Sequence, residues 1–284
     1  MNTYYYRICG LRLRLDASHP FPENTQSDLF LTGEAIPDVS LSLQAVDSIP
    51  EPSGTVCPAP LEIPTFRDGT QISRCSWDTF RPHMHMRTDY SLEQPDQITC
   101  FVREEYWPWA THSKYLWPGV MLNYLLLHHR GLIFHASCIE HQGQGILFTA
   151  PSQTGKSTQA NLWQQYRHAQ IINGDKTGIS LNNPVMVHGV PFSGTSGICQ
   201  NISVPLKAIV VLSQASENTV TLLSPSQAIS ALFPNLFVDR AINEEWQLAL
   251  HLMLDLISQI PVYSLACTPD ERAVITLEQA LYHT

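Results

Sequence analysis

The chain is poor in charged residues. Only 14% of its 284 residues are charged, against about 25% in typical soluble domains. Its net charge is −9 with histidine neutral, and no basic stripe runs along it. Nucleic acid is therefore not an expected partner, since proteins that bind it cluster Lys and Arg on one face. A phosphate ligand would need positive charge supplied locally.

The chain also lacks paired cysteines and long apolar runs. Its seven cysteines are scattered and contain no C-x-x-C pair, which argues against a zinc site or a disulfide framework and favours a reducing compartment. The first residues lack the apolar core of a signal peptide. No run approaches the roughly 18 apolar residues that span a bilayer. We expect a soluble cytoplasmic protein with no membrane partner.

The first part of the chain has the pattern of a β-rich domain. Its length admits one large or two ordinary domains. Alternating or apolar runs at residues 6–15, 38–43 and 97–102 are separated by proline-rich breaks at 49–54 and 58–64. Runs with a period of two, bounded by Pro and Gly, predict antiparallel strands. We assign residues 1–116 to an N-terminal domain that would select a substrate or partner.

The second part, residues 117–284, mixes helices and strands. The class is therefore α/β with α+β character. Helices are predicted at 118–130, 224–233, 243–257 and 269–281. Strands are predicted at 132–140, 146–149, 169–173, 178–181, 185–188, 206–213 and 261–265.

Residues 150–158 carry the strongest functional signal. They read Ala-Pro-Ser-Gln-Thr-Gly-Lys-Ser-Thr and fit the Walker A pattern A/G-x4-G-K-S/T. Such a P-loop turns its backbone N–H groups toward phosphates at a helix N-terminus, where the helix dipole favours anions. In this pattern the lysine reaches the outer phosphates and the following hydroxyl ligates Mg²⁺. The predicted nucleotide-binding residues are Ser152, Gln153, Thr154, Gly155, Lys156, Ser157 and Thr158.

The flanks of this loop support a nucleotide site. An apolar strand precedes it, and residues 157–166 have near-helical spacing of apolar side chains. Ala150 stands where Gly is usual, and Gln153 lies in mid-loop, which leaves Gly155 for backbone angles that other residues avoid. The alternative is a helix capped by Ser or Thr that contains Gly-Lys-Ser by chance.

Three other residues are candidates for the same site. Asp175 follows a predicted strand, where ligands gather in open α/β sheets, although an aspartate in Gly-Asp-Lys is also a common turn residue. His135 lies within an apolar strand and would orient Asp175 or take part in acid–base exchange, or be a structural histidine. Lys176 would balance phosphate charge or be solvated. Residues 191–197, rich in Gly and hydroxyls, are a substrate-facing loop or a plain turn.

Three parts of the chain resemble, in the same order, the C-terminal domain of HPr kinase/phosphorylase and the phosphoenolpyruvate-carboxykinase-like kinases. They are His135, the loop at 145–157 and the segment 171–176. The ending, residues 261–270, resembles small HPr-kinase-like proteins of peptide-modification clusters, including lasso-peptide kinases. The resemblance covers roughly residues 118–284. It implies a P-loop kinase domain with a mixed sheet and antiparallel strands around the loop.

The resemblance also implies roles for the site residues. Asp175 would be the base or the metal-linked carboxylate, Lys156 would hold the phosphates of ATP, and Ser157 would bind Mg²⁺. His135 would line the site. The family has two adjacent acidic residues where this chain has Gly174 and Asp175, so one carboxylate is kept here. HPr kinases form rings of subunits, so a homo-oligomer is an expectation.

Three functions follow from these residues. The first is an ATP- and Mg²⁺-dependent kinase that phosphorylates a hydroxyl of a peptide, a protein or a small metabolite. The second is a catalytically degenerate nucleotide-binding protein that acts as a sensor or binds a partner. The third is a binding or scaffold protein whose β-rich N-terminal region does the recognising.

Overall fold

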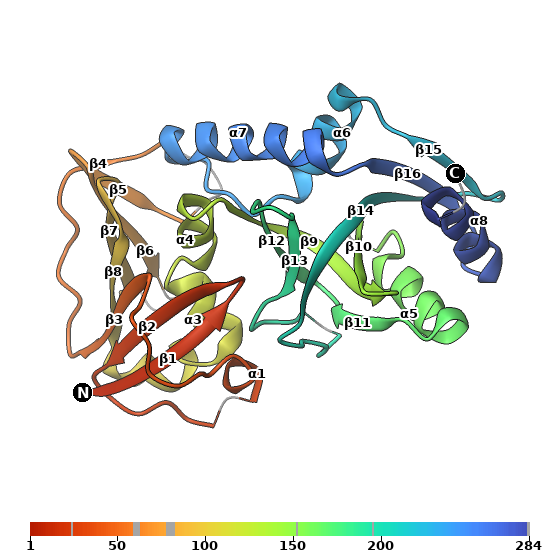
Figure 1. Cartoon of the computed structure of the whole chain (residues 1–284). Coiled ribbons are helices and arrows are strands. Elements are labelled where there is room, and N and C mark those ends of the chain that lie inside the picture. The colour runs from red at the N-terminus through yellow and green to blue at the C-terminus, as the bar shows by residue number, and fades with distance from the viewer. Residues whose placement is uncertain (24, 59–62, 78–82, 152, 195, 283–284) are drawn as a thin grey trace. The chain divides into compact units, whose positions relative to one another are not determined.

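The chain divides into two compact units. The computed structural model describes residues 1–23, 25–58, 63–77, 83–151, 153–194 and 196–282. Unit 1 comprises residues 1–129 and 238–247, and unit 2 comprises residues 130–237 and 248–284 (Figure 1). The predicted domain boundary at 116/117 falls inside the helix α3 (Ser113–Gly119). Each unit contains a mixed sheet with helices, as the α/β class requires.

Among the described residues, the sheet of unit 1 has eight strands in the order β1-β2-β3-β8-β7-β6-β5-β4. Its strands have the alternating burial of a sheet with one covered face, as in β3 and β7. The strands are β1 (Asn2–Ile8), β2 (Leu11–Ala17), β3 (Val39–Val46), β4 (Thr55–Val56), β5 (Thr65–Asp68), β6 (Gln71–Trp77), β7 (Met84–Ser91) and β8 (Gln94–Arg103).

Two features of this sheet differ from the sequence-based expectation. The run at 6–15 forms a hairpin of β1 and β2, because Cys9 and Gly10 turn the chain with positive φ angles. The strand β3 pairs parallel with both β2 and β8, so the expectation of antiparallel strands is wrong there. Between β2 and β3 lie about 20 residues, including α1 (Thr25–Asp28), which is enough chain for a parallel crossover.

The predicted helix at 118–130 is also wrong as one continuous element. The chain forms α3 and then α4 (Leu122–His128), with Met121 between them in the left-handed region at φ 60°. The carbonyl of Gly119 accepts a hydrogen bond from the Thr88 hydroxyl at 2.7 Å. A Cβ at Gly119 would collide with the side chain of Met86. Both helices belong to unit 1, as do η1 (Glu104–Tyr106) and α2 (Trp107–Ala110).

The sheet of unit 2 includes β10, the strand that leads into the predicted phosphate loop. Its order is β10-β9-β12-β13-β14-β16-β15, with β11 paired to β9 and β10 also paired to β14. The strands are β9 (Gly131–His141), β10 (Gln144–Thr149), β11 (Gln170–Asn173), β12 (Lys176–Ser180), β13 (Met186–Gly189), β14 (Ser203–Gln214), β15 (Thr219–Leu222) and β16 (Val262–Cys267). Its helical elements are α5 (Lys156–Arg167), α6 (Pro225–Leu232), η2 (Phe233–Asn235) and α8 (Glu271–Tyr282), while α7 (Asn243–Gln259) begins in unit 1 and continues in unit 2.

Strand direction places the loop at one edge of this sheet. The predicted hairpin is confirmed, because β9 and β10 pair antiparallel. The strand β14 runs parallel to both β10 and β16. The carboxyl ends of these three strands therefore point to the same edge, the place where α/β proteins gather ligands.

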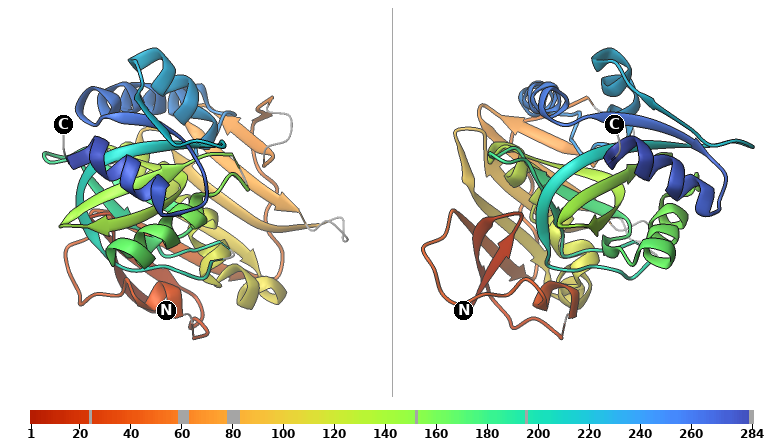
Figure 2. Two further views of the ribbon diagram at one scale, coloured as in Figure 1. Left: turned by 90° about the vertical axis from the view of Figure 1, so that its right-hand side faces the viewer. Right: turned by 45° about the vertical axis from the view of Figure 1, so that its right-hand side comes forward.

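The helices α5 and α8 cover one face of this sheet (Figure 2). Their apolar side chains join those of β9, β10, β14 and β16 in one buried cluster. The cluster includes Trp163 of α5, Val274 and Leu277 of α8 and Phe148 of β10, none of which is exposed to solvent. Burial of these large side chains fixes the start of α5 against the end of β10.

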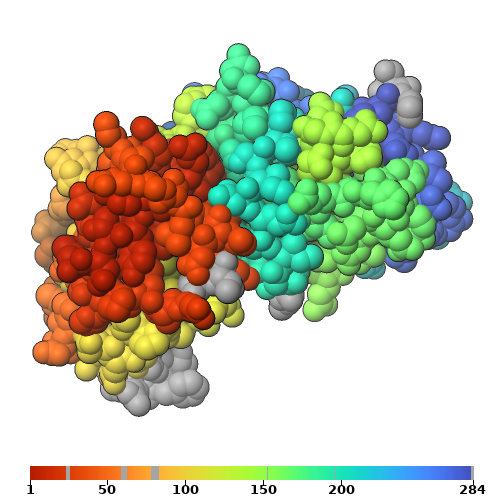
Figure 3. All heavy atoms as spheres, turned by 60° about the horizontal axis from the view of Figure 1, so that its bottom comes forward, coloured from red at the N-terminus to blue at the C-terminus, as the bar shows by residue number. Residues whose placement is uncertain are grey.

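The segment between β13 and β14 lies beside β11. Its backbone bonds to β11, since the N–H of Gln200 donates to the Ile172 carbonyl at 2.9 Å. In Figure 3 its teal surface adjoins the green surface of α5 and β11. Within the described ranges, no helix combines the length and the hydropathy of a bilayer-spanning segment.

Truncating a large side chain of the apolar cluster under α5 should open a cavity and destabilise unit 2. Phe148→Ala should lower the free energy of unfolding of unit 2 by about 3–5 kcal/mol, as for other buried aromatic truncations. Leu222→Ala, at a side chain that is 61% exposed, should change it by no more than about 0.5 kcal/mol. Urea denaturation followed by circular dichroism measures both, and equal values for the two variants would contradict this packing.

Candidate functional site

The phosphate loop leads from β10 into α5 through backbone angles that few residues adopt. Gly155 is the N-cap of α5 with φ 119°, a region open to glycine but costly for other residues. Gln153 also has a positive φ, of 64°. The N-cap therefore carries no side chain, unlike the Ser/Thr cap that the chance-motif alternative requires. Ser152, predicted to bind nucleotide, lies outside the described residues.

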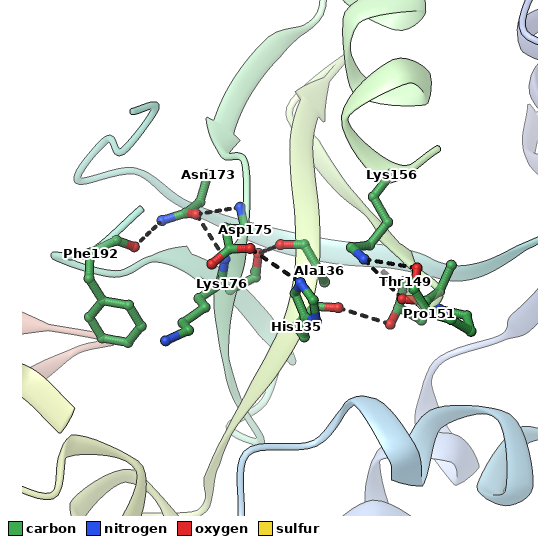
Figure 4. A network of polar contacts seen from close by, with 11 residues as sticks. His135, Ala136, Thr149, Pro151, Lys156, Asn173, Asp175, Lys176 and Phe192 are labelled. Carbon is green, nitrogen blue, oxygen red and sulfur yellow. Dashed lines mark hydrogen bonds and ion pairs between the residues drawn. The ribbon is translucent and has the colours of Figure 1, made fainter. Parts of the chain in front are cut away.

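Lys156 is held against this loop. It is the first residue of α5 and is only 8% exposed. Its Nζ donates hydrogen bonds to the carbonyls of Ala150, at 2.9 Å, and Pro151, at 3.3 Å (Figure 4). Burial lowers the pKa of Lys156, and the charge of Asp175 opposes this effect. The ammonium group is thus oriented toward the loop before any anion arrives.

Asp175 and His135 form a pair next to the loop. The Nε2 of His135 lies 3.2 Å from Oδ1 of Asp175, and both side chains are about one third exposed. The hydrogen bond from His135 lowers the pKa of Asp175 and outweighs the opposing effect of burial. The charges of His135, Lys176 and Lys156 act in the same direction. The side chain of Asp175 is therefore ionised near neutral pH.

The pair is positioned by the backbone of two strands. In the register of β9 with β12, His135 lies opposite Lys176. The N–H of Ala136 donates to the Asp175 carbonyl at 2.9 Å, which continues this pairing one residue beyond β12. On the other side, the hydroxyl of Thr149 donates to the His135 carbonyl at 3.1 Å. Asp175 is thus bonded to β9, and His135 is bonded to β10, the strand that leads into the loop.

Asn173 organises the turn that presents Asp175, and sequence reasoning gave it no role. Its side chain is fully buried. Its Oδ1 accepts from the N–H groups of Asp175 and Lys176, each at 3.0 Å. Its Nδ2 donates to the carbonyls of Val190 and Phe192, each at 3.2 Å (Figure 4). The signal was the Asn-Gly-Asp sequence after a strand, which is typical of an Asx turn.

The segment after β13 reaches the site as well. The Nζ of Lys176 lies over two aromatic rings, 4.7 Å from the centroid of Phe192 and 4.6 Å from that of Phe237. Such cation–π contacts stabilise an ammonium group near the site. A Cβ at Gly194 would lie 2.5 Å from Cγ of Asp175. Two residues of the segment considered above as a turn or a substrate-facing loop thus lie at the site, Phe192 next to Lys176 and Gly194 next to Asp175.

One cavity joins most of the predicted site residues. It has a volume of about 290 Å³, and its walls include residues of β9, the phosphate loop and the β11–β12 turn. Lys156 and Asp175 face the same space, so the loop has room for an anion beside a carboxylate. The lining residues are His135, Gln153, Gly155, Lys156, Ser157, Thr158, Gly174, Asp175 and Ser196. Thr154 lines a neighbouring cavity instead.

The place of the second acidic residue is filled by a neighbour. A Cβ at Gly174 would lie 2.7 Å from Cβ of Ser196 and would collide with its hydroxyl. Any side chain at position 174 must therefore displace Ser196. With glycine at this position, Asp175 is the one carboxylate among the residues that line the cavity.

Two side chains of the cavity carry oxygen ligands of the type that Mg²⁺ prefers. The described residues contain no cluster of three or more His, Cys, Asp or Glu side chains that would form a cage for a metal. Ser157 and the ionised Asp175 line the same cavity. Mg²⁺ is usually held by one or two such groups together with water and substrate phosphates. These two residues would hold it here.

Comparisons with known proteins place the chain in a family. The structure of the HPr(Ser) kinase/phosphatase from Coxiella burnetii aligns with 53% of this chain and 95% of its own, at 13% identity and a TM-score of 0.30. This score is too low to carry a conclusion. A search of curated proteins finds no match. The model of the family "SynChlorMet cassette protein ScmC" matches residues 113–282. Because that match spans more than half of the sequence, this chain belongs to the ScmC family.

Proposed function

We propose that this chain is an ATP- and Mg²⁺-dependent kinase of the P-loop type. It transfers a phosphoryl group to a hydroxyl of a peptide, a protein or a small metabolite. The observation that carries the proposal is the shared cavity of Lys156, Ser157, His135 and Asp175. Phosphoryl transfer requires positioning and electrostatic stabilisation more than covalent chemistry, and these four side chains supply both.

Each residue of the cavity has its own role in this transfer. The loop N–H groups and the Lys156 ammonium bind the outer phosphates of ATP. The Asp175 carboxylate accepts the proton of the acceptor hydroxyl, and His135 orients that carboxylate through its hydrogen bond. As the acceptor oxygen forms its bond to the γ-phosphorus of ATP, the bond between that phosphorus and the β,γ-bridging oxygen breaks. ADP leaves with that electron pair.

Ser157 and Asp175 would hold Mg²⁺ at this edge of the cavity. When bound there, the ion would supply neutralisation of the phosphate charge. Asp175 is suited to this role because its pKa is lowered, so that it stays ionised.

A second function is favoured by the contact of Gly174 with Ser196. This contact leaves one carboxylate where kinases of the resembling family have two. A nucleotide-binding protein without transfer, acting as a sensor or a partner-binding subunit, would tolerate this loss. Single-turnover experiments with γ-labelled ATP, cell extract and hydroxyl-bearing peptides separate the two functions. Binding of ATP without any labelled acceptor would favour the second.

Loss of the loop ammonium should abolish nucleotide binding. Mg²⁺–ATP binds the folded chain and should raise its melting temperature. Lys156→Ala should remove this shift, because the outer phosphates lose their cation. Lys114→Ala, at an exposed lysine of unit 1, should keep it. A full shift in Lys156→Ala would refute the assignment of this loop.

Loss of the carboxylate should separate binding from transfer. Asp175→Asn should slow phosphoryl transfer at saturating ATP by about 10²–10⁴-fold, the usual contribution of a general base. The ATP-induced thermal shift should be reduced but not lost, because Lys156 and Ser157 still line the cavity. Asp16→Asn, which changes an aspartate of unit 1 paired with Arg14, should leave the rate unchanged. A normal rate in Asp175→Asn would exclude this residue as the base.

Nucleotide binding should take up protons at alkaline pH. Since burial lowers the pKa of Lys156, its ammonium is lost at a lower pH than the ordinary lysine value of about 10.4. Phosphates bind the protonated form, so affinity should fall as pH rises through this lowered pKa. Calorimetry in buffers of different ionisation enthalpy near pH ~9.5 should detect the uptake. Unchanged affinity up to that ordinary value would contradict the lowered pKa.

A further inference from the structure

We infer that a second cavity beside the phosphate loop binds the nucleoside part of the phosphoryl donor. This inference rests on the proposed function, because it concerns the same nucleotide. It assigns the donor to the nucleoside triphosphates and excludes inorganic pyrophosphate. The cavity has a volume of about 350 Å³ and shares Gly155 and Thr158 with the phosphate cavity. A ligand that occupies both would pass over the N-terminus of α5.

The position of this cavity follows from strand direction. Its walls include Gln214, the last residue of β14, and Cys267, the last residue of β16. These residues lie opposite each other in the parallel pairing of the two strands. The phosphate loop follows β10, the other parallel neighbour of β14. Both cavities therefore open at the carboxyl edge of adjacent parallel strands, which is where a ligand extending from the loop would lie.

A buried amide without a complete set of partners faces this cavity. Gln159, on the first turn of α5, lines the cavity and is only 2% exposed. Its Nε2 lies 3.3 Å from Sγ of Cys267. Its Oε1 is buried and accepts no hydrogen bond from any residue that the structure describes. Leaving a buried oxygen without a hydrogen bond is unfavourable, so a ligand that donates a hydrogen bond here recovers that free energy.

The chemistry of the walls suits a nucleoside. Leu212, Ala215 and Pro269 supply apolar surface for a flat base, while Gln159 and Thr268 supply polar groups. A volume of this size lies at the lower end of the range for small-molecule sites, about 300–1,000 Å³. The Oε1 of Gln159 would accept from an amino group of the base or from a ribose hydroxyl. Inorganic phosphates at the loop would leave this oxygen unpaired.

The test compares ATP, GTP and inorganic triphosphate, each with Mg²⁺, by calorimetry on the full chain. We expect at least one nucleotide to bind about tenfold or more tightly than inorganic triphosphate, since only the nucleotides reach Gln159. Gln159→Met keeps the length of the side chain but removes the amide. It should weaken binding of that nucleotide by about tenfold, the effect of one buried hydrogen bond, and leave inorganic triphosphate unchanged. Gln165→Met, at an exposed position of the same helix, is the matched control.

The outcomes separate this inference from the proposed function. Equal affinity for nucleotides and inorganic triphosphate, or an equal loss of both in Gln159→Met, would overturn the nucleoside cavity while leaving the phosphate loop intact. Absence of binding by all three ligands would overturn the proposed function as well. Loss of all binding in Lys156→Ala, together with a loss of nucleotide affinity but not of triphosphate affinity in Gln159→Met, would support both.

A second measurement uses the wild-type chain, so it does not depend on the folding of a variant. The thiol of Cys267 is partly exposed at the cavity, and burial raises its pKa. Bound nucleotide should slow its alkylation by a maleimide, whereas inorganic triphosphate should not. Cys57, the partly exposed thiol of unit 1, reports the intrinsic rate when both sites are quantified by mass spectrometry. Unchanged labelling of Cys267 with saturating nucleotide would reject the cavity as the nucleoside site.

Discussion

The four hydrogen bonds of the Asn173 amide hold the turn on which the candidate site depends. Its oxygen accepts from the N–H groups of Asp175 and Lys176, and its nitrogen donates to two carbonyls of the segment after β13. A fully buried amide is stable only when its polar atoms are satisfied. Satisfying this one fixes both the direction of Asp175 and the position of the segment that contacts it. Without Asn173, the turn would lose its link to the segment after β13, and Asp175 would be held by its backbone bond to Ala136 and its contact with His135 alone.

The loop and the turn meet because β9 bonds to strands on both sides. The strand β9 pairs with β10, which leads to Lys156, and with β12, which follows Asp175. His135 lies on β9 between them and contacts Asp175 directly. The relative positions of the ammonium, the imidazole and the carboxylate are thus set by backbone ladders rather than by flexible side chains. This is the arrangement that precise positioning of a phosphoryl group requires.

Local signals predicted most of the secondary structure of unit 2, although they missed β15. They did not predict the contacts between segments distant in sequence. The hairpin before the loop and the helix after it follow from short-range patterns. The break between α3 and α4 depends on Met86 and Thr88, which lie far from it in sequence. The parallel pairing of β3 depends on two distant strands. Likewise, the two carbonyls that accept from Nδ2 of Asn173, and the Ser196 side chain next to Gly174, come from the segment after β13, so no local pattern contains them.

The charge of the whole chain makes the local arrangement decisive. With a net charge of −9, the long-range field repels a nucleotide, but salt screens that repulsion beyond a Debye length of about 8 Å. Within that distance the phosphates would meet Lys156, the loop amides and the N-terminus of α5, where the helix dipole favours anions. A single carboxylate in the cavity repels them less than two would. The packing of Ser196 against Gly174 therefore removes one candidate ligand for Mg²⁺ but strengthens the attraction for phosphate, which suits nucleotide binding under either proposed function.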